Sequence, residues 1–326
     1  MLETYDFLRQ WLPNNIFLGH NELTEFRTIF RHLIHVYLRY FIEYFPYLNI
    51  TELNFDPFEA DCLASSFVFF FISVLYIAHQ PNWGDKIDAI VKYNILYPLI
   101  DHYLDSDKIT QNILHQMMDL IETPSNYNEV KDPILWKAGQ IYYDLVSTNP
   151  KIEEGMYELF STQVAGLYLQ RSHEKDLTLF SSIAREKGYR TMKILEIISD
   201  NQEDEIINTM GNIIQLLDDS VDVLEDRKNN IRTIATLILE RDGVLDEIWT
   251  NIAQEIKEIS GEYPTFTIFF VSFLVYLPLN DPELYSGDIV EFCQNSNYYP
   301  ITEKISEKLT DSIYSEFIHK IEKMNV

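Results

Sequence analysis

Apolar residues recur at three- and four-residue spacing through almost the whole chain, which is the period of α-helices with one buried face. Alternating strand patterns and hairpin dipeptides are absent. The sequence therefore predicts an all-α protein of roughly a dozen helices. We expect them at about residues 21–45, 56–79, 85–105, 106–121, 133–146, 153–171, 176–199, 204–228, 232–240, 245–259, 263–277, 282–293 and 301–324.

Composition favours a single large domain. Of the 326 residues, 46% are hydrophobic and 14% aromatic, which is ample material for one core. The few glycines and prolines are scattered, so no flexible or proline-rich linker divides the chain. We expect one helical domain over residues 1–326.

The formal net charge of −26 argues against nucleic acid as a partner, because phosphate binding requires clustered Lys and Arg. An anionic small molecule can still bind where metal ions or a local basic cluster reverse the field. Cys62 and Cys293 match no metal-binding spacing, and they fit either reduced core thiols or one distant disulfide.

No targeting or membrane segment is predicted. The N-terminus has neither a basic region nor an apolar region of the kind found in signal peptides. The most apolar runs, residues 64–78 and 266–279, are shorter than the roughly 18 to 20 residues that a membrane-spanning helix needs. We expect no transmembrane segment and a cytoplasmic protein.

The helix expected at 204–228 carries an acidic stripe. Residues four apart lie above one another on a helix, which aligns Asp218, Asp222 and Asp226, with Asp219 beside them. Stacked like charges weaken an isolated helix by a few tenths of a kcal/mol per pair. A hard divalent cation such as Mg²⁺, which takes oxygen ligands, explains this pattern. The alternative is a solvated acidic face.

A second acidic pair lies near the end of the helix expected at 85–105. Asp101 and Asp105 are one turn apart, and Pro98 removes a backbone donor one turn earlier. Alone, this pair fits a solvated helix end equally well. Together, two acidic helix ends could face each other across a bundle and hold metal ions. His102 beside this pair is expected to be a polar neighbour of the site, not a ligand.

These two motifs resemble those of the class I isoprenoid synthases, the all-α superfamily of trans-prenyltransferases, squalene/phytoene synthases and terpene synthases. Gln215-x-x-Asp218-Asp219-x-x-Asp222 is similar to the second aspartate-rich motif, Asp222-x-x-Glu225-Asp226 to its squalene/phytoene synthase form, and Asp101-x-x-x-Asp105 to the first motif. The resemblance implies a bundle around a central apolar cavity. It also implies that about three Mg²⁺ ions join a substrate diphosphate to Asp101, Asp105, Asp218, Asp219, Asp222 and Asp226.

The resemblance also implies basic residues that bind the diphosphate. Arg190 follows a helix break expected at residues 186–189, and Arg227, Lys228 and Arg232 follow the second motif. The alternative for Arg190 is a solvated cation that offsets nearby Glu. Tyr298 and Tyr299, before the last helix, are further candidates for closing the site.

Departures from the family narrow the expected reaction. The first motif lacks the tandem aspartate of prenyltransferases, and no Arg-Arg pair follows it to bind isopentenyl diphosphate. The Asn-x-x-x-Ser-x-x-x-Glu triad of microbial terpene cyclases is also absent. We expect a terpene synthase, a carbon–oxygen lyase that ionises a linear prenyl diphosphate with Mg²⁺ and then cyclises or quenches the carbocation. The alternatives are a prenyltransferase, a squalene/phytoene synthase-like coupling enzyme, or a non-catalytic helical partner subunit. The oligomeric state stays open, with a homodimer among the possibilities.

Overall fold

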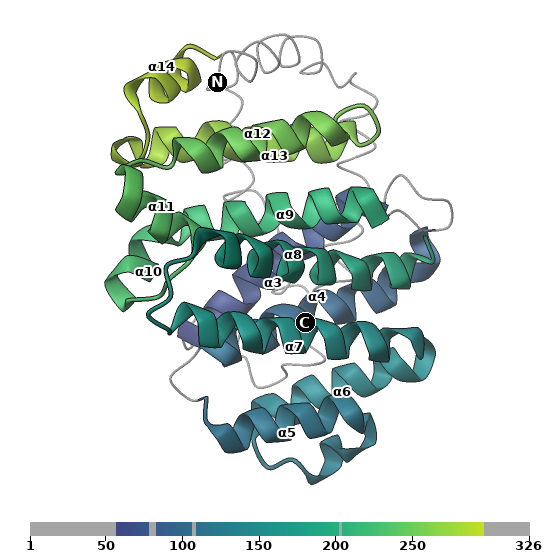
Figure 1. The fold of residues 1–326 in the computed structure, drawn as a ribbon. Helices are drawn as coiled ribbons and strands as arrows, with labels where there is room; N and C mark the ends of the chain where they lie inside the picture. The colour runs from purple at the N-terminus through teal and green to yellow at the C-terminus, as the bar shows by residue number, and fades with distance from the viewer. Residues whose placement is uncertain (1–56, 78–82, 106–108, 202–203, 297–326) are drawn as a thin grey trace, which may run out of the picture. The chain divides into compact units, whose positions relative to one another are not determined.

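The computed structural model describes residues 57–77, 83–105, 109–201 and 204–296, and in these ranges it contains helices and no strand (Figure 1). The prediction of an all-α protein is therefore confirmed. The helices expected at 21–45 and 301–324, and Tyr298 and Tyr299, lie outside the described residues. The helices are α3 (Pro57–Ile77), η1 (Trp83–Lys86), α4 (Ile87–Asp105), α5 (Gln111–Glu122), η2 (Pro124–Glu129), α6 (Pro133–Thr148), α7 (Lys151–Gln170), α8 (Leu177–Ser199), α9 (Asp204–Val221), α10 (Val223–Asn229), α11 (Ile234–Asp242), α12 (Asp246–Ile259), α13 (Pro264–Asn280), η3 (Pro282–Leu284) and α14 (Gly287–Asn295).

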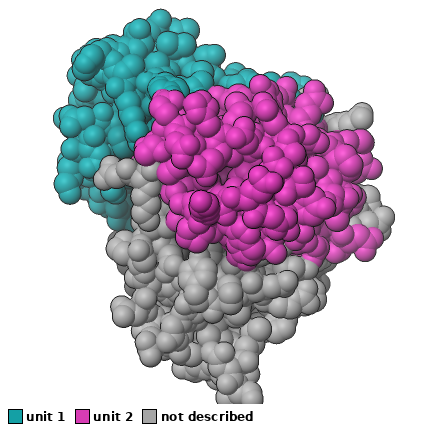
Figure 2. All heavy atoms as spheres, turned by 90° about the horizontal axis from the view of Figure 1, so that it is seen from below, with its two compact units in different colours: residues 1–21, 162–193, 203–311 teal, residues 22–161, 194–202, 312–326 magenta. Residues whose placement is uncertain are grey.

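The described residues form two compact units, shown in different colours in Figure 2. The first unit contains residues 162–193 and 204–296, and the second contains residues 57–161 of the described ranges together with 194–201. Both units are assembled from separate stretches of chain, and α7 and α8 each contribute residues to both. The single domain expected from composition stays a prediction.

In the second unit, α4 packs against α3 and α6. A buried polar pair joins α3 to α4: the hydroxyl of Ser73 donates to Oδ1 of Asn94 at 2.8 Å, and Nδ2 of Asn94 donates to the carbonyl of Ile90 at 2.6 Å. Both side chains are fully buried, so these hydrogen bonds satisfy groups that would otherwise be costly to bury.

The acidic end of α4 is held by the start of α6. Asp132 caps α6, since its Oδ1 accepts hydrogen bonds from the amides of Ile134 at 2.9 Å and Leu135 at 3.0 Å. Its other oxygen accepts from the hydroxyl of Tyr103 at 2.7 Å. Tyr103 is a buried residue of α4, so the helix cap of α6 also fixes the turn of α4 that carries the first acidic pair.

In the first unit, α12 packs against α9 and α13 (Figure 1). Trp249 of α12 is 1% exposed, and its indole nitrogen donates to the carbonyl of Leu274 on α13 at 2.8 Å. The buried side chains of Ile213 on α9 and Ile256 on α12 belong to the core of this unit.

The backbones of α8 and α9 are in direct contact at two glycines. A Cβ atom built on Gly211 would lie 2.7 Å from the backbone nitrogen of Tyr189, and closer still to the carbonyl of Gly188. A Cβ atom on Gly188 would meet the carbonyl of Gly211 in the same way. The prediction of a helix break at 186–189 was wrong, because α8 runs through these residues. The absence of a side chain at Gly188 allows the backbones of α8 and α9 to approach, and the helix continues past this residue.

Three further findings bear on the predictions from sequence. Helix α5 begins after Thr110, whose side chain accepts a hydrogen bond from the amide of Ile113, and the residues expected to cap it (106–107) lie outside the described ranges. Cys293 is a free, buried thiol, and burial raises its pKa to about 12. Among the described helices, none combines the length and the apolar character needed to cross a membrane.

Candidate functional site

The acidic stretch is built on two helices instead of the one predicted at 204–228. Helix α9 ends at Val221 and α10 begins at Val223, with Asp222 between them. The four-residue hydrogen-bond ladder nevertheless continues, since the amide of Asp222 donates to the carbonyl of Asp218 at 3.1 Å and that of Asp226 to the carbonyl of Asp222 at 2.8 Å. The three aspartates therefore follow one another through the junction, as the spacing predicts.

The carboxylates of this stretch differ in their exposure. Asp218 and Asp222 are exposed, Asp226 is partly exposed, and Asp219 is buried at 6% exposure. The carboxylates of Asp218 and Asp222 are accessible to a ligand from solvent. The carboxylate of Asp219 is enclosed within its unit.

Asp219 is held by hydrogen bonds from two directions. Nε2 of Gln215 donates to its Oδ1 at 2.9 Å, and the backbone amide of Ile234, the first residue of α11, donates to the carboxylate. Burial raises the pKa of Asp219 to about 6, although these hydrogen bonds and the nearby Lys187 act in the opposite direction. Asp219 therefore joins α9 to α11, and its assignment as a metal ligand has less support than those of Asp218 and Asp222.

The donor chemistry of the exposed pair fits Mg²⁺. Within the described ranges, no three His, Cys, Asp or Glu side chains converge as a ready metal site. Mg²⁺ is usually held by one or two carboxylates together with substrate phosphates and waters, so it does not require three protein ligands. Asp218 and Asp222 can supply the protein oxygens of such a site, with Asp226 one turn further along.

Two basic residues directly follow these carboxylates. Arg227 and Lys228 occupy the last turn of α10, and both are exposed. Neither side chain makes a hydrogen bond or an ion pair with another described residue. Of the four predicted diphosphate-binding residues, Arg227 and Lys228 are the two whose side-chain charges are not paired with another described residue.

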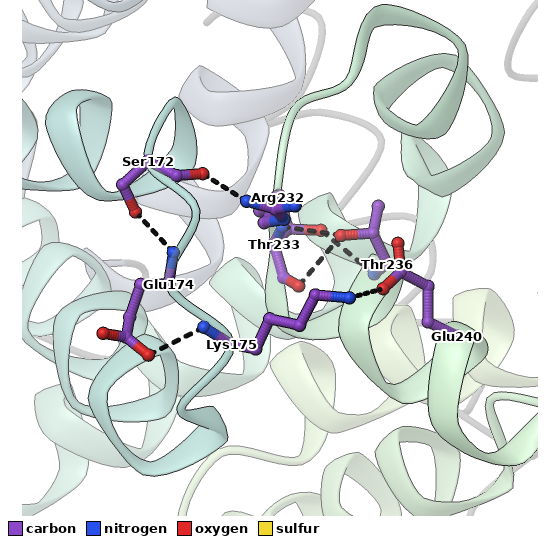
Figure 3. A network of polar contacts seen from close by, with 7 residues as sticks. All are labelled: Ser172, Glu174, Lys175, Arg232, Thr233, Thr236 and Glu240. Atoms are coloured by element: carbon purple, nitrogen blue, oxygen red, sulfur yellow. Dashed lines mark hydrogen bonds and ion pairs between the residues drawn. The ribbon is translucent and has the colours of Figure 1, made fainter.

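The other two predicted diphosphate-binding residues have protein partners. Nε of Arg190 pairs with Oε1 of Glu186 at 2.6 Å, and its guanidinium lies 5.2 Å from the ring centre of Tyr189. The guanidinium of Arg232 donates to the backbone carbonyl of Ser172 (Figure 3). Their role at a diphosphate stays a prediction, and the structure gives each a contact within the protein.

A polar network joins the connection after α7 to α11 and to Arg232 just before it (Figure 3). Nζ of Lys175 pairs with Oε2 of Glu240 at 3.2 Å, and the hydroxyl of Ser172 accepts from the amide of Glu174 at 3.1 Å. Thr233 and Thr236 form a reciprocal capping box at the first turn of α11. Sequence reasoning missed this network; the Thr-x-x-Thr spacing was the one local signal for the helix start.

The first acidic pair lies at the end of α4 in the other unit. Asp101 is partly exposed and Asp105 is exposed. Tyr93 and Tyr97 precede Asp101 at four-residue spacing, and their ring centres are 6.1 Å apart. Burial, Tyr97 and Asp101 together raise the pKa of Tyr93 well above its usual range.

Phe69 of α3 completes this aromatic group, with ring centres 5.7 Å from Tyr93 and 4.8 Å from Tyr97. Sequence reasoning did not single out these three rings, although the spacing of Tyr93 and Tyr97 was visible. Nε2 of His102 hydrogen-bonds with the hydroxyl of Ser65 at 2.9 Å. Because the two acidic motifs belong to different units, their pairing around one metal cluster stays a prediction.

Comparison of the chain with protein-family models, with curated proteins and with solved structures finds no match. The function is therefore argued from the residues and the geometry of each unit.

Proposed function

We propose that this chain is a class I terpene synthase that ionises a linear prenyl diphosphate with Mg²⁺ and then cyclises or quenches the carbocation. One observation carries the proposal. The exposed carboxylates of Asp218 and Asp222 are followed by the exposed cations of Arg227 and Lys228, which come one to two turns after Asp222. In the sequence, potential metal ligands are therefore followed by cations that can neutralise an anion.

The roles of the residues follow from the charges involved. Loss of diphosphate from an allylic carbon creates a carbocation and a highly charged leaving group. Mg²⁺, when bound, supplies Lewis-acid stabilisation of that leaving group. Asp218 and Asp222 hold the metal, while Arg227 and Lys228 lower the charge on the departing diphosphate. The assignment of Asp101 and Asp105 to the same cluster rests on the family resemblance alone.

The test is a substrate panel. The protein is incubated with geranyl, farnesyl or geranylgeranyl diphosphate, with and without isopentenyl diphosphate, in Mg²⁺ or in EDTA. We expect hydrocarbons or alcohols of unchanged carbon number, formed only with Mg²⁺. A product longer by five carbons would instead support the prenyltransferase alternative, and a product of doubled length the coupling enzyme.

A non-catalytic partner subunit is the remaining alternative, in which Asp218 and Asp222 bind no metal ion. It predicts no increase in melting temperature on addition of Mg²⁺ with inorganic diphosphate. The proposed synthase predicts an increase that requires both components, since each completes the binding site of the other.

A further inference from the structure

We propose that Arg232 is a positioning residue, which fixes the connection between α10 and α11 and so holds α10 in place before any ligand binds. The family resemblance instead suggested that a basic residue in this segment closes over the diphosphate. The inference refines the proposed function, and it rests on backbone contacts that can be measured without substrate.

Five consecutive backbone amides of this connection are already used as donors. The amide of Asn230 donates to the carbonyls of Arg227 and Asp226, and that of Ile231 to Asp226 at 2.9 Å. The amide of Arg232 donates to the carbonyl of Gln170 at 3.0 Å.

The next two amides continue the series. The amide of Thr233 donates to the hydroxyl of Thr236 at 2.8 Å, and that of Ile234 donates to the carboxylate of Asp219. The connection is thus bonded to α7, α9, α10 and α11 at once. A segment that must swing over a ligand would have to break several of these bonds.

Among the residues of this connection, Arg232 makes the contacts that span the longest stretch of sequence. Its amide donates to the carbonyl of Gln170, the last residue of α7. Its guanidinium donates to the carbonyl of Ser172, two residues beyond the end of that helix (Figure 3). Carbonyls at a helix C-terminus lack intrahelical partners and carry partial negative charge, so a cation is stabilised there. The side chain is partly buried, which strengthens this contact relative to one in full contact with water.

The consequence concerns Arg227 and Lys228. Helix α10 has only seven residues, and it is fixed at one end by the hydrogen-bond ladder from α9 and at the other by the Arg232 connection. Arg227 and Lys228 must then reach a diphosphate by side-chain motion alone. Arg232 acts through them and does not touch the ligand.

Hydrogen–deuterium exchange on the full chain tests this. In the free protein, we expect amides 230–234 to be protected, and Mg²⁺ with inorganic diphosphate to change their exchange less than threefold. In Arg232→Ala, exchange at 223–234 and 171–176 should accelerate about tenfold or more, with little change in α12 and α13. Arg232→Lys, which keeps a charged donor, should restore part of the protection.

The matched control is Arg241→Ala, which removes another arginine of this unit whose partners are the exposed Asp242 and Glu247. Exchange at 223–234 should not change in this variant. The inference is overturned if 230–234 exchange freely in the wild type, if they become protected only with Mg²⁺ and diphosphate, or if Arg232→Ala accelerates exchange uniformly.

Calorimetry separates this inference from the proposed function. If Mg²⁺–diphosphate binds the wild type, Arg227→Ala should reduce the salt dependence of its affinity, whereas Arg232→Ala should leave that dependence unchanged. A reduced salt dependence in Arg232→Ala would identify a direct contact and overturn the inference. If the wild type binds no diphosphate, the proposed function fails, and the exchange comparison still decides the role of Arg232.

Discussion

Asp218 and Asp219 are neighbours in the sequence, but they lie in opposite environments. Asp218 is exposed, whereas Asp219 is buried and accepts hydrogen bonds from Gln215 and from the start of α11. Residues one apart on a helix point about 100° away from each other, so one can face solvent while the next faces the core. The two carboxylates should therefore respond differently to substitution and to pH.

Asp219 should make the stability of the metal-free protein depend on pH. Its folded-state pKa is raised to about 6, mainly by burial, so its contribution is fully present below about pH 4 and is lost as the pH rises through 6. Asp219→Asn cannot ionise. The free energy of unfolding of the wild type, relative to this variant, should therefore fall by about 2 kcal/mol between pH 4 and pH 6.5.

Urea denaturation in EDTA at four pH values across this window measures the effect. Asp218→Asn serves as the control, because an exposed aspartate should contribute little to such a difference. The assigned environment of Asp219 would be contradicted if the difference in free energy of unfolding between the wild type and Asp219→Asn did not change with pH. An increase of this difference with pH would contradict it as well.

For single residues, the sequence could indicate which side chains are able to bind metal or diphosphate, but not the direction in which each side chain points. The four-residue spacing of Asp218, Asp222 and Asp226 is intrinsic to a helix and was therefore predictable. The burial of Asp219 and the contact of Arg232 with Ser172 depend on segments roughly 15 and 60 residues away in the chain, which local patterns do not report.

Among the elements, the contact between α8 and α9 is set by two glycines. Gly188→Ala or Gly211→Ala would place a methyl group against the backbone of the other helix, which cannot yield as a flexible side chain would. We expect either change to destabilise the protein by about 3 kcal/mol in denaturant unfolding. Gly261→Ala is the control, because a Cβ atom there would meet no atom within 4 Å. Equal midpoints for Gly211→Ala and Gly261→Ala would show that α8 and α9 are not in backbone contact.

The start of α6 offers a second test at the scale of elements. Asp132→Ala should cost about 2 kcal/mol, because it removes a helix cap and the acceptor of the Tyr103 hydroxyl. Tyr103→Phe should cost about 1 kcal/mol, because it removes only one hydrogen bond. In the double variant, the cost of Tyr103→Phe should nearly vanish, since its partner is already gone. Fully additive costs would contradict the Tyr103–Asp132 contact.

Helix positions were largely predictable, because apolar spacing and prolines are local signals. Helices α3, α6 and α12 lie within two residues of their predicted bounds where described. Three predictions were wrong: the helix break at 186–189, the continuous helix through Asp222, and the continuous helix at 282–293, where η3 ends at Leu284 and α14 begins at Gly287. The first two errors have separate local causes. Gly188 resembles a helix end in the sequence, because its packing partner on α9 cannot be known from local residues. The junction at Asp222 keeps the four-residue hydrogen bonds of a helix, so the spacing of the aspartates does not change there.

At the scale of the whole molecule, the two acidic motifs fall in different compact units, and each unit holds its motif by its own contacts. In one unit, the Tyr103–Asp132 contact fixes the end of α4; in the other, Asp219 and Arg232 fix the surroundings of α10. The proposed chemistry is argued from the motif at α9 and α10, and a role for Asp101 and Asp105 in the same reaction stays a prediction.

The most direct measurement of the central claim is the release of inorganic diphosphate from farnesyl and geranylgeranyl diphosphate by the full chain. We predict release that requires Mg²⁺ and that falls at least about a hundredfold in Asp218→Asn and in Asp222→Asn, while Glu205→Gln, an exposed acidic residue on α9, stays at the wild-type rate. Release that persists in EDTA, wild-type rates in either aspartate variant, or no release from any prenyl diphosphate would contradict the account.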